Sequence, residues 1–517
     1  MNGVGKPSHL DAAGTDVEGR VAVQQHGLTN TAFAIPFFRG YDCPKEVTDR
    51  TMSSSGSSFS LAPTTESVLD LIGNTPMVRL RSFDVGLCEL YVKLENQNPG
   101  GSIKDRIGKS MIDAAERDGL IRPGGTLVEA TAGNTGLALA LVASQRGYGC
   151  VLVVPDKMSR EKIMHLKALG AKVVTTRSDV GRGHPAYYQD LAKKIADETP
   201  GAFFVNQFAN PANVLAHFTT TGPEIFEQTQ GRVDAVVCGV GSGGTISGLS
   251  QYFAKVRPTL EMVLADPVGS ILADYIETGT YGPAGSWLVE GIGEDFIPSI
   301  ADFSRTRHAF RISDTESIDV ARRLLTDEGI FAGSSSGTLV AAAVKYAKAQ
   351  TSPKVVVTFI CDTGAKYLSK VHNEAWLEQS GMIKVKMFGD LRDLISHKSE
   401  NGSLISLLPD DLLSTAYARM RLYDVSQLPV LLDGKLIGIV DESDLLIATR
   451  DEPAAFAKHV QDAMTRKLEK LSPGGSVRDV LGVLDRGMVA VIADENSFYG
   501  LITKVDLLNH LRHKNNK

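Results

Sequence analysis

The chain has 517 residues, of which 43% are hydrophobic and 22% charged, and these values predict two or three globular domains. Its net charge of −6 leaves no basic field for nucleic acid or an anionic membrane surface, so we expect small molecules and further copies of the chain as partners. No stretch approaches the ~20 apolar residues of a membrane span. The five cysteines include no Cys-x-x-Cys pair, so we expect a cytoplasmic protein without disulfides or metal.

Residues 1–65 show no hydrophobic period and end in a serine-rich run, so we predict a flexible N-terminal tail. From 66 to 381, short β-branched runs alternate with stretches of helical period. The predicted strands are 89–95, 126–129, 150–155, 172–176, 235–239 and 262–266, and the helical stretches include 104–118, 135–146 and 160–169. This alternation predicts an α/β domain with a mainly parallel sheet and ligands at the carboxyl ends of its strands.

Residues 382–402 form a charged stretch that we interpret as a linker, and residues 403–517 contain an internal repeat. The segment Gly438–Leu446 returns 62 residues later as Gly500–Leu508. A pair of predicted strands around a turn leads into each copy, at 429–432 with 435–440 and at 488–493 with 498–503. The repeat predicts a pseudo-symmetric tandem module.

The segment 98–106 reads Asn-Pro-Gly-Gly-Ser-Ile-Lys-Asp-Arg, and its lysine is Lys104. Lys104 follows a glycine-rich turn and opens a helix near a buried strand end. Desolvation at such a position lowers the pKa of the amine and frees it as a nucleophile. A single lysine at a helix start is more often a solvated charge, so the interpretation depends on the motifs around it.

Three further loops each lead into a helix. Residues 131–136 read Thr-Ala-Gly-Asn-Thr-Gly, where unpaired backbone N–H groups can hold a carboxylate. Residues 241–245 read Gly-Ser-Gly-Gly-Thr, which suits a phosphate, and residues 333–337 read Gly-Ser-Ser-Ser-Gly. Each loop alone could equally be a capped turn. With Gly239 and Asp266, the second loop also matches a dinucleotide-binding fingerprint, which would make the chain a nicotinamide dehydrogenase.

These motifs occur together and in order, followed by Glu-Gly-Ile-Gly-Glu-Asp-Phe at 290–296. Over residues 66–381 the chain strongly resembles the family of cystathionine β-synthase and cysteine synthase, which are fold-type II pyridoxal-phosphate enzymes. The resemblance implies a catalytic domain of two parallel-sheet α/β subdomains with pyridoxal 5'-phosphate as cofactor. It argues against the dehydrogenase, because hydride transfer requires neither Lys104 nor the loop around Asn134.

The resemblance also implies a role for each motif. Lys104 is the catalytic lysine that carries the cofactor, Asn134 hydrogen-bonds the cofactor's ring hydroxyl, and Ser335 faces the pyridine nitrogen. A neutral hydroxyl at that nitrogen favours elimination over transamination. The remaining implied contacts are Gly241, Ser242, Gly243, Gly244 and Thr245 to the phosphate, and Thr131, Ala132, Gly133 and Thr135 to the substrate carboxylate.

The implied reaction is a β-replacement that joins serine or O-acetylserine to homocysteine and forms cystathionine, as in transsulfuration, with hydrogen sulfide as a further product from cysteine. Cysteine synthase, which uses sulfide, shares all these residues and remains an alternative. A non-catalytic adenylate-sensing protein with an enzyme-like fold is the alternative of another class.

Three departures from the family pattern limit these expectations. Ala132 stands where many cystathionine β-synthases have serine, which leaves the leaving group of the donor open, and Phe208 replaces a tyrosine. Animal relatives bind haem through an N-terminal cysteine and histidine. Here Cys43 has no histidine between it and Lys104, and the nearest, His26, lies upstream, so we expect no haem.

The C-terminal repeat resembles the paired CBS domains of a Bateman module. The second copy keeps a pattern in which a hydroxyl and an acid, here Thr503 and Asp506, hold a nucleotide. The first copy has Asp441 where the hydroxyl belongs, which disfavours an adenosyl ligand. Relatives bind S-adenosylmethionine in this module, but we favour a structural or self-associating role here. We expect a homodimer, which the module could extend to a higher oligomer.

Overall fold

The computed structural model describes residues 64–515 apart from 132, 157, 182, 384–386, 397–403, 451–452 and 496. Almost all of the predicted tail, including His26 and Cys43, lies outside the described residues, as does Ala132. Within the described part of the chain, no helix is long and apolar enough to cross a membrane.

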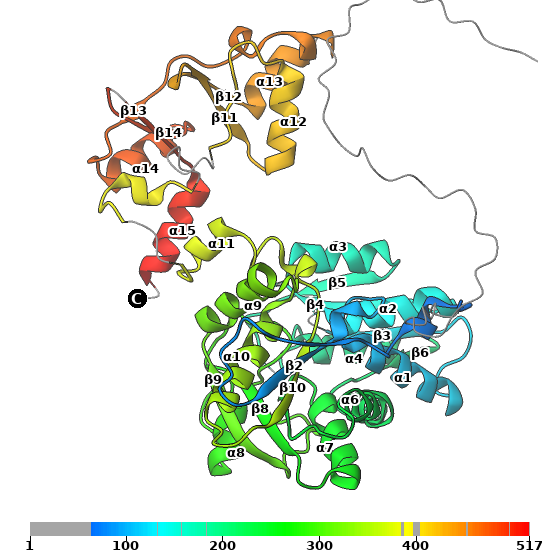
Figure 1. Ribbon diagram of the computed structural model, residues 1–517. Coiled ribbons are helices and arrows are strands. Elements are labelled where there is room, and N and C mark those ends of the chain that lie inside the picture. The colour runs from blue at the N-terminus through cyan, green and yellow to red at the C-terminus, as the bar shows by residue number, and fades with distance from the viewer. Residues whose placement is uncertain are drawn as a thin grey trace, which may run out of the picture. The chain divides into compact units, whose positions relative to one another are not determined.

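A six-stranded sheet forms the core of the first subdomain (Figure 1). The strand order is β1-β2-β10-β7-β8-β9, and all neighbours are parallel except β1 and β2. The strands are β1 (Met77–Arg79), β2 (Glu89–Leu94), β7 (Ala235–Gly239), β8 (Glu261–Pro267), β9 (Thr306–Ile312) and β10 (Val355–Ile360). The central strand β10 is buried along its whole length, as expected for a parallel sheet covered on both faces.

The helices of this subdomain are α6 (Gly222–Gln228), α7 (Gly244–Val256), α8 (Leu272–Thr278), α9 (Asp314–Glu328) and α10 (Ser334–Lys348). Helix α10 packs directly on β10, β7 and β8, and it also lies against α9. Helix α9 ends at Gly329, whose φ of 71° is a left-handed conformation that glycine adopts without strain.

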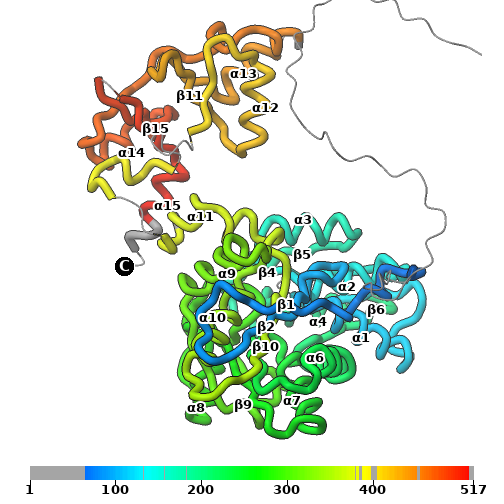
Figure 2. The backbone as a smooth tube through the Cα atoms, viewed as in Figure 1, coloured from blue at the N-terminus to red at the C-terminus, as the bar shows by residue number. Residues whose placement is uncertain are grey.

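A four-stranded parallel sheet of order β5-β4-β3-β6 forms the second subdomain. Its strands are β3 (Thr126–Ala130), β4 (Gly149–Pro155), β5 (Lys172–Thr176) and β6 (Ala202–Phe204). The helices of this region are α1 (Lys104–Arg117), α2 (Asn134–Arg146), α3 (Arg160–Ala168), α4 (Tyr188–Glu198) and α5 (Pro211–Ala216). The chain makes this sheet between β2 and β7 and later inserts β10 between those two strands. Figure 2 shows β10 beside β2. The expected pair of parallel-sheet subdomains is confirmed, with β1 as the one antiparallel strand.

Short helical elements complete the catalytic region. They are η1 (Val68–Leu71), η2 (Glu95–Gln97), the π-helical turn η3 (His217–Thr221), η4 (Gly364–Tyr367) and α11 (Glu374–Gln379). The turn η4 begins directly after β10, at the carboxyl end of the large sheet, with Thr363 capping it through a hydrogen bond from the Ala365 N–H.

The C-terminal repeats have matching cores. The first contains α12 (Leu413–Tyr423), β11 (Gln427–Leu432), β12 (Lys435–Asp441) and α13 (Glu442–Thr449), and the second contains β13 (Lys470–Leu471), α14 (Val477–Asp485), β14 (Ala490–Ala493), β15 (Phe498–Ile502) and α15 (Lys504–Asn515). In both, the predicted strand pair is an antiparallel hairpin. The repeats pack on each other where Ile439 meets Val491 and Phe498.

Part of the predicted linker 382–402 belongs to this module. Leu391, Leu394 and Ile395, on and after η5 (Leu391–Leu394), are buried in one core with Val480 and other residues of the second repeat. The sequence did not reveal this, because the apolar residues lie on and next to a short 3-10 turn and have charged residues around them. Between the repeats lie η7 (Pro453–Ala457) and η8 (Val460–Asp462).

Candidate active site

A cavity of about 400 Å³ lies between the two subdomains of the catalytic region. Residues from both sheets line it, at the carboxyl ends of β3, β7 and β10, as the fold predicts. The predicted site residues on its wall are Lys104, Thr131, Gly133, Asn134, Thr135, Gly241, Ser242, Thr245 and Ser335. Gly243 and Gly244 cap and open the helix that follows, and Ala132 lies outside the described residues. The motifs that the sequence analysis singled out therefore meet at one place.

Lys104 is the first residue of α1 and projects into this cavity. The backbone just before it is fixed, since the Ile103 N–H donates to the Cys361 carbonyl over 2.8 Å. Burial lowers the pKa of the Lys104 ammonium, and the neighbouring Asp362 and Glu294 carboxylates oppose that shift only in part. An amine with a lowered pKa is available as a nucleophile and as a base.

The glycine loop at the start of α7 is packed so closely against neighbouring residues that its glycine positions have no space for side chains. A Cβ on Gly241 would lie 2.7 Å from the Gly291 carbonyl oxygen, and a Cβ on Gly244 would overlap the Asn213 side chain. Gly243 has a φ of +89°, a conformation that residues with side chains rarely adopt. The loop therefore brings bare backbone N–H groups to the N-terminus of a 13-residue helix, which is an arrangement that favours an anion.

Side chains around this loop add neutral donors. The Asn213 amide donates to the Ser242 hydroxyl over 2.9 Å, and its own oxygen is buried without a partner among the described residues. Thr245 Oγ1 lies 3.1 Å from Nε2 of His217. Burial holds the pKa of His217 well below its usual range, so the imidazole is neutral. Hydroxyls, bare amides and a helix N-terminus are the donors that a phosphate monoester needs, so the loop fits the phosphate of pyridoxal phosphate.

The Asn134 side chain is held on both sides. Its Nδ2 donates to Asp362 Oδ2 over 2.6 Å, and its Oδ1 accepts from Lys366 Nζ over 2.9 Å. Lys366 also donates to the carbonyls of Gly100 and Gly101, and burial lowers its pKa to about 8. One N–H of Asn134 stays available for a further acceptor, such as the ring oxygen that the resemblance implies.

Ser335 lies in the first turn of α10 and is buried at the cavity wall. The Cys361 thiol lines the same cavity, and burial raises its pKa to about 12. Both groups are therefore neutral at physiological pH. A neutral hydroxyl beside a neutral thiol fits the expectation that no carboxylate faces the pyridine nitrogen.

In the loop at 131–136, some of the backbone N–H groups that could hold a carboxylate are already hydrogen-bonded within the loop. The Thr131 hydroxyl accepts the N–H groups of Gly133 and Gly136 at 3.1 and 3.3 Å, so these two amides are occupied within the loop. As the first residues of α2, Asn134 and Thr135 have backbone N–H groups without an intrahelical acceptor. The Thr135 hydroxyl donates to Gln207 over 2.7 Å. A carboxylate would be bound by two amides at this helix start.

The sequence analysis missed a set of ion pairs at the cavity. Glu290 accepts from Lys162 Nζ over 2.6 Å and from Lys370 Nζ over 2.7 Å. The Lys162 ammonium also lies 4.3 Å from the centre of the Tyr367 ring. Glu290 belonged to a recognised motif, but the two lysines lie in ordinary helical and loop sequence, and no local signal marks them.

Asp266, which completed the dinucleotide-binding fingerprint, is buried inside the protein and contacts the start of a helix. It is fully buried, and its Oδ2 accepts from the Ala273 N–H over 2.9 Å at the start of α8. Burial raises its pKa to about 6. It does not line the cavity that contains Lys104, so the position has no part in the site.

The C-terminal module has a cleft of about 690 Å³ between its repeats, lined by Asp441, Asp444, Thr503 and Asp506 among others. Asp506 accepts from the Thr503 N–H and hydroxyl, both at 2.7 Å, and so caps its own helix. Asp441 and Asp444 form the corresponding capping box of α13. Both predicted nucleotide contacts therefore lie in one cleft, whose wall carries five carboxylates, four side-chain hydroxyls and two lysines.

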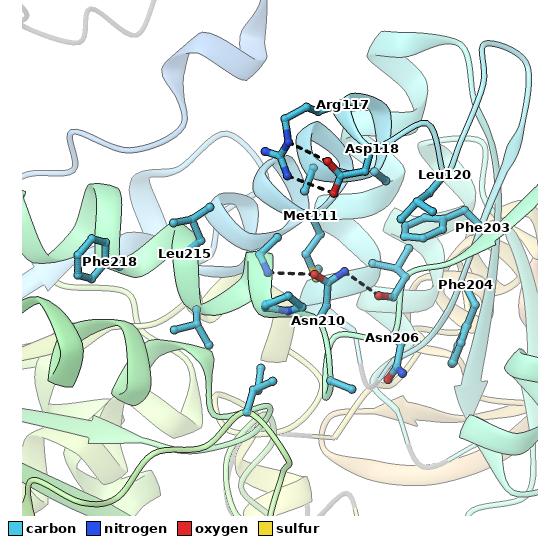
Figure 3. A pocket seen from close by; sticks show the side chains of 18 of the residues that line it. Met111, Arg117, Asp118, Leu120, Phe203, Phe204, Asn206, Asn210, Leu215 and Phe218 are labelled. Atoms are coloured by element: carbon cyan, nitrogen blue, oxygen red, sulfur yellow. Dashed lines mark hydrogen bonds and ion pairs between the residues drawn. The ribbon is translucent and has the colours of Figure 1, made fainter.

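A larger hollow, of about 1090 Å³, lies elsewhere on the catalytic region and contains none of the predicted site residues (Figure 3). Its wall comes from α1, α5, α7 and the strand β6 and includes Met111, Leu215 and Phe218. Asn210 is already bound within it, donating to the Val205 carbonyl and accepting from the Ala212 N–H. This hollow is mainly apolar and lacks the convergent donors of a catalytic site.

Comparisons with known proteins agree with this geometry. Residues 68–362 match the model of the family described as pyridoxal-phosphate dependent enzymes, and residues 392–451 and 460–513 match the CBS domain. Cystathionine beta-synthase of Apis mellifera is 34% identical over 458 residues, covering 86% of this chain and 90% of that protein. The namesake of Dictyostelium discoideum is 34% identical over 462 residues, covering 86% and 92%.

Two solved structures share the catalytic fold. O-ureido-L-serine synthase has a TM-score of 0.55 and 36% identity over 60% of this chain and 95% of its own. A hydrogen sulfide-producing enzyme from Fusobacterium nucleatum has a TM-score of 0.55 and 35% identity over 59% of this chain and 100% of its own. From its family models, its full-length relatives and the cavity around Lys104, this chain belongs to the cystathionine β-synthase family of pyridoxal-phosphate dependent enzymes.

Proposed function

We propose that the chain catalyses a β-replacement that joins a serine-type amino acid to homocysteine and yields cystathionine. One observation supports this more than any other. Lys104 lies in the same cavity as a helix start suited to a carboxylate and a glycine loop suited to a phosphate. The relatives named cystathionine beta-synthase support the acceptor, since the matches cover 90% and 92% of their length.

We assign the cofactor contacts as follows. Lys104 would hold pyridoxal phosphate covalently, Asn134 and Ser335 would contact its ring, and the loop from Gly241 to Thr245 would hold its phosphate. When bound there, the cofactor stabilises negative charge at the α-carbon of an amino acid. The Asp362 and Lys366 side chains would fix Asn134, which limits rotation of the ring-contacting amide.

The chain's own groups then have separate tasks. The backbone amides at the start of α2, with Thr131 and Thr135, bind the substrate carboxylate and orient the α-carbon. The Lys104 amine, whose pKa burial lowers, takes the α-proton and holds it at Nζ until it is returned to the product. Gln207 holds the Thr135 hydroxyl in place by accepting its hydrogen bond. Substrate binding thus takes place at the N-terminus of α2 and proton transfer at the N-terminus of α1, within one cavity.

Cysteine is a second donor that the comparisons favour, because a structural neighbour is a hydrogen sulfide-producing enzyme. With cysteine in place of serine, the same replacement releases hydrogen sulfide and forms cystathionine. Cysteine synthase activity, with sulfide as acceptor, remains the alternative reaction of this site.

The test is a product assay with purified protein and added cofactor. Serine, O-acetylserine and cysteine are each offered with homocysteine and sulfide in competition, and the products are separated by chromatography. We expect cystathionine from homocysteine to predominate. Cysteine as the main product would identify a sulfide-using enzyme instead. If the protein binds the cofactor with a normal spectrum but forms no product, it is a non-catalytic protein.

We also propose that two chains form a homodimer through the apolar hollow of Figure 3. Leu120 and Leu215 are 60% and 44% exposed there, and large exposed apolar side chains grouped on one face are typical of an interface. Sedimentation of Leu215→Glu tests this proposal. We expect that variant to be monomeric under conditions in which the unaltered chain is a dimer, and an unchanged dimer would contradict the surface.

For the C-terminal module we propose a structural, self-associating role rather than a S-adenosylmethionine site. The support is the charge of its cleft, to which Asp441, Asp444 and Asp506 contribute carboxylates. Asp441 and Thr503 are equivalent positions of the two repeats, and only Thr503 has the hydroxyl of the nucleotide-binding pattern. Calorimetry with S-adenosylmethionine tests this proposal, and tight binding would contradict it.

A further inference from the structure

Two hydroxyls of the glycine loop, those of Ser242 and Thr245, line the cavity that contains Lys104. Among the described residues each hydroxyl has a single hydrogen-bond partner, and both partners belong to the continuous segment of α5 and η3. The partner of Ser242 is Asn213, and the partner of Thr245 is His217. Residues four positions apart share one face of a helix, so a single face of this segment contacts both hydroxyls.

Close packing against α7 fixes the position of this segment. A Cβ on Gly248 would lie 2.5 Å from the Val214 carbonyl oxygen and 2.8 Å from Cβ of His217. Only a glycine at this position lets the two helices approach so closely. Thr245 lies three residues before Gly248 on the same helix, so the distance between Thr245 and His217 is set by the packing of backbone on backbone.

The contact between Asn213 and Ser242 has a defined direction. Nδ2 of Asn213 lies 2.9 Å from Ser242 Oγ and 2.9 Å from the Gln207 carbonyl oxygen, which can only accept a hydrogen bond. The group that faces the carbonyl is therefore the amide NH2, and its second hydrogen goes to Ser242. Since no described residue accepts the hydrogen of the Ser242 hydroxyl, that hydrogen is left for an acceptor in the cavity.

The direction of the second contact depends on which ring nitrogen of His217 carries the proton. Nδ1 lies 3.0 Å from Thr221 Oγ1, and Nε2 lies 3.1 Å from Thr245 Oγ1. Burial, with the charges of Arg106 and Lys104, holds the pKa of the ring well below its usual range. A neutral ring has one N–H, so it donates to one of the two threonines and accepts from the other.

The burial of Thr221 decides between the two tautomers. Thr221 is 0% exposed, and within the described part of the chain its hydroxyl has no partner other than His217. A proton on Nδ1 would be donated to Thr221, whose own hydrogen would then be buried without an acceptor, which is unfavourable. With the proton on Nε2, Thr221 donates to Nδ1 and the ring donates to Thr245. The hydrogen left over then belongs to Thr245, which lines the cavity.

The direction of these hydrogen bonds matters because a phosphate dianion only accepts them. A hydroxyl whose hydrogen is turned toward a histidine nitrogen presents its lone pairs to the phosphate, which repel it. In the Nε2–H tautomer, Ser242 and Thr245 both have their hydrogens available on the cavity side before any anion binds. Donors that are oriented in advance lower the cost of binding.

We propose that His217 is a positioning residue for the cofactor phosphate, which Thr221 holds in the Nε2–H tautomer and which turns the hydroxyl hydrogen of Thr245 toward that phosphate. The inference rests on the cofactor contacts assigned under the proposed function and adds the groups that orient them. Neither His217 nor Thr221 is among the described residues that line the cavity, so His217 acts through Thr245.

The first test determines the tautomer in the full chain without cofactor. The 15N chemical shifts of the two ring nitrogens of a neutral histidine differ according to which nitrogen carries the proton. The signals of His217 are assigned by their absence from the spectrum of His217→Gln. We expect the proton on Nε2 at neutral pH, and a proton on Nδ1 or a charged ring would overturn the inference.

The second test measures the binding of pyridoxal phosphate and of pyridoxal, which lacks the phosphate, by absorbance titration of the apoenzyme. His217→Leu removes the donor to Thr245 and should raise Kd for pyridoxal phosphate by about tenfold, since a hydrogen bond to a charged group is weakened. Kd for pyridoxal should stay the same, because this ligand has no phosphate for Thr245 to bind.

A second substitution reaches the same contact from a distance. Thr221→Val keeps the size of the side chain and removes the hydroxyl that fixes the tautomer. We expect a smaller rise in Kd for pyridoxal phosphate, no change for pyridoxal, and His217 ring signals from both tautomers. If His217→Leu does not fold, Thr221→Val supplies the comparison of the two ligands.

Two controls complete the experiment. His217→Gln places an amide NH2 near the position of Nε2 and should keep most of the affinity for pyridoxal phosphate. Thr219→Val is the same substitution in the same π-helical turn, but Thr219 is exposed and its hydroxyl donates to the Leu215 carbonyl. We expect Thr219→Val to leave both Kd values and the His217 signals unchanged.

The outcomes separate the inference from the proposed function. An unaltered chain that takes up neither ligand would overturn the cofactor assignment itself. If the unaltered chain binds pyridoxal phosphate but the substitutions at 217 and 221 leave Kd unchanged, or raise Kd for pyridoxal by the same factor, the inference alone is wrong. A rise that is confined to the phosphorylated ligand supports it.

Discussion

Asn134 donates a hydrogen bond of 2.6 Å to Asp362, a residue 228 positions further along the chain. Asn134 opens α2 of the smaller sheet's subdomain, and Asp362 follows β10 of the larger sheet. The same Asp362 oxygen accepts the Tyr367 hydroxyl over 2.6 Å. One buried carboxylate therefore fixes the side chain that we assign to the cofactor ring, across the boundary between the two subdomains.

This contact predicts a coupling between two substitutions. Asp362→Ala should weaken the binding of pyridoxal phosphate by about tenfold, because Asn134 loses the acceptor that orients it. Asn134→Ala should weaken it as well. The double variant should be less impaired than the sum of the single effects, by ~0.5–3 kcal/mol, since the two residues act through one contact. Absorbance titration of the apoenzyme with the cofactor measures these values, and strictly additive effects would count against the assignment.

A second prediction concerns the buried ion network behind Lys104. Arg106 lies 2.8 Å from Glu95 and 2.7 Å from Glu224, and its side chain is 1% exposed. Burial alone would raise the pKa of Glu224, but Arg106 and Lys93 bring it down to about 2. Arg106→Met leaves two buried carboxylates without this cation and should lower the free energy of unfolding by ~3–5 kcal/mol. Urea unfolding measures the loss.

The chain offers a matched control for that experiment. Arg117, on the same helix, pairs with Asp118, and both side chains are at least half exposed. Arg117→Met should leave the free energy of unfolding almost unchanged, because an exposed ion pair contributes little. Equal effects of the two arginine substitutions would contradict the importance of burial.

A third prediction links Glu129 to the pH dependence of stability. Glu129 is 1% exposed, its Oε2 has no partner among the described residues, and burial raises its pKa to about 8. Between the unfolded value near 4.5 and about 8, the folded state keeps a proton that the unfolded state has lost. The contribution of Glu129 to the free energy of unfolding is therefore fully present below pH 4.5. It falls as the pH rises, by at most ~1.4 kcal/mol per pH unit.

Glu129→Gln removes that titration while keeping the shape of the side chain. Unfolding curves recorded from pH 5 to pH 8 should show a steeper decline for the unaltered chain than for this variant. Parallel declines would mean that the Glu129 carboxyl does not keep its proton in the folded state.

A fourth prediction concerns the cleft of the C-terminal module. Asp441→Ser replaces a carboxylate with the hydroxyl that the second repeat has at Thr503, and a serine can still cap α13. Removing the charge should increase the affinity for S-adenosylmethionine or another adenosyl compound. Calorimetric titration of the full chain measures the change, and an affinity that stays equal or falls would show that Asp441 does not limit binding.

In the catalytic region the sequence was sufficient for strands β2, β3, β4, β5, β7 and β8, but not for β9, and it was sufficient for the motifs that surround the cavity. Strand β10 was missed although it is central, because this run of six residues is apolar except for Thr358 and has no alternation that separates a strand from a buried helix. The short strands β1 and β6 have three residues each, which is too few for any period.

The site shows the same limit. Lys104, Asn134 and the glycine loop are marked by turn chemistry that local sequence reveals. Asp362 and Lys366 are not, since their importance arises from contacts with residues more than 200 positions away. The occupied amides of the Thr131 loop were likewise invisible, because only three-dimensional coordinates show that the threonine hydroxyl turns back onto its own helix.

Borohydride trapping tests the central claim most directly. Reducing the purified protein with its cofactor fixes any covalent link, and peptide mass spectrometry then identifies the lysine that carries it. Our account predicts the label on Lys104, and no label there in Lys104→Ala. A label on Lys366 or Lys162 instead, or a chain that takes up no pyridoxal phosphate, would contradict it.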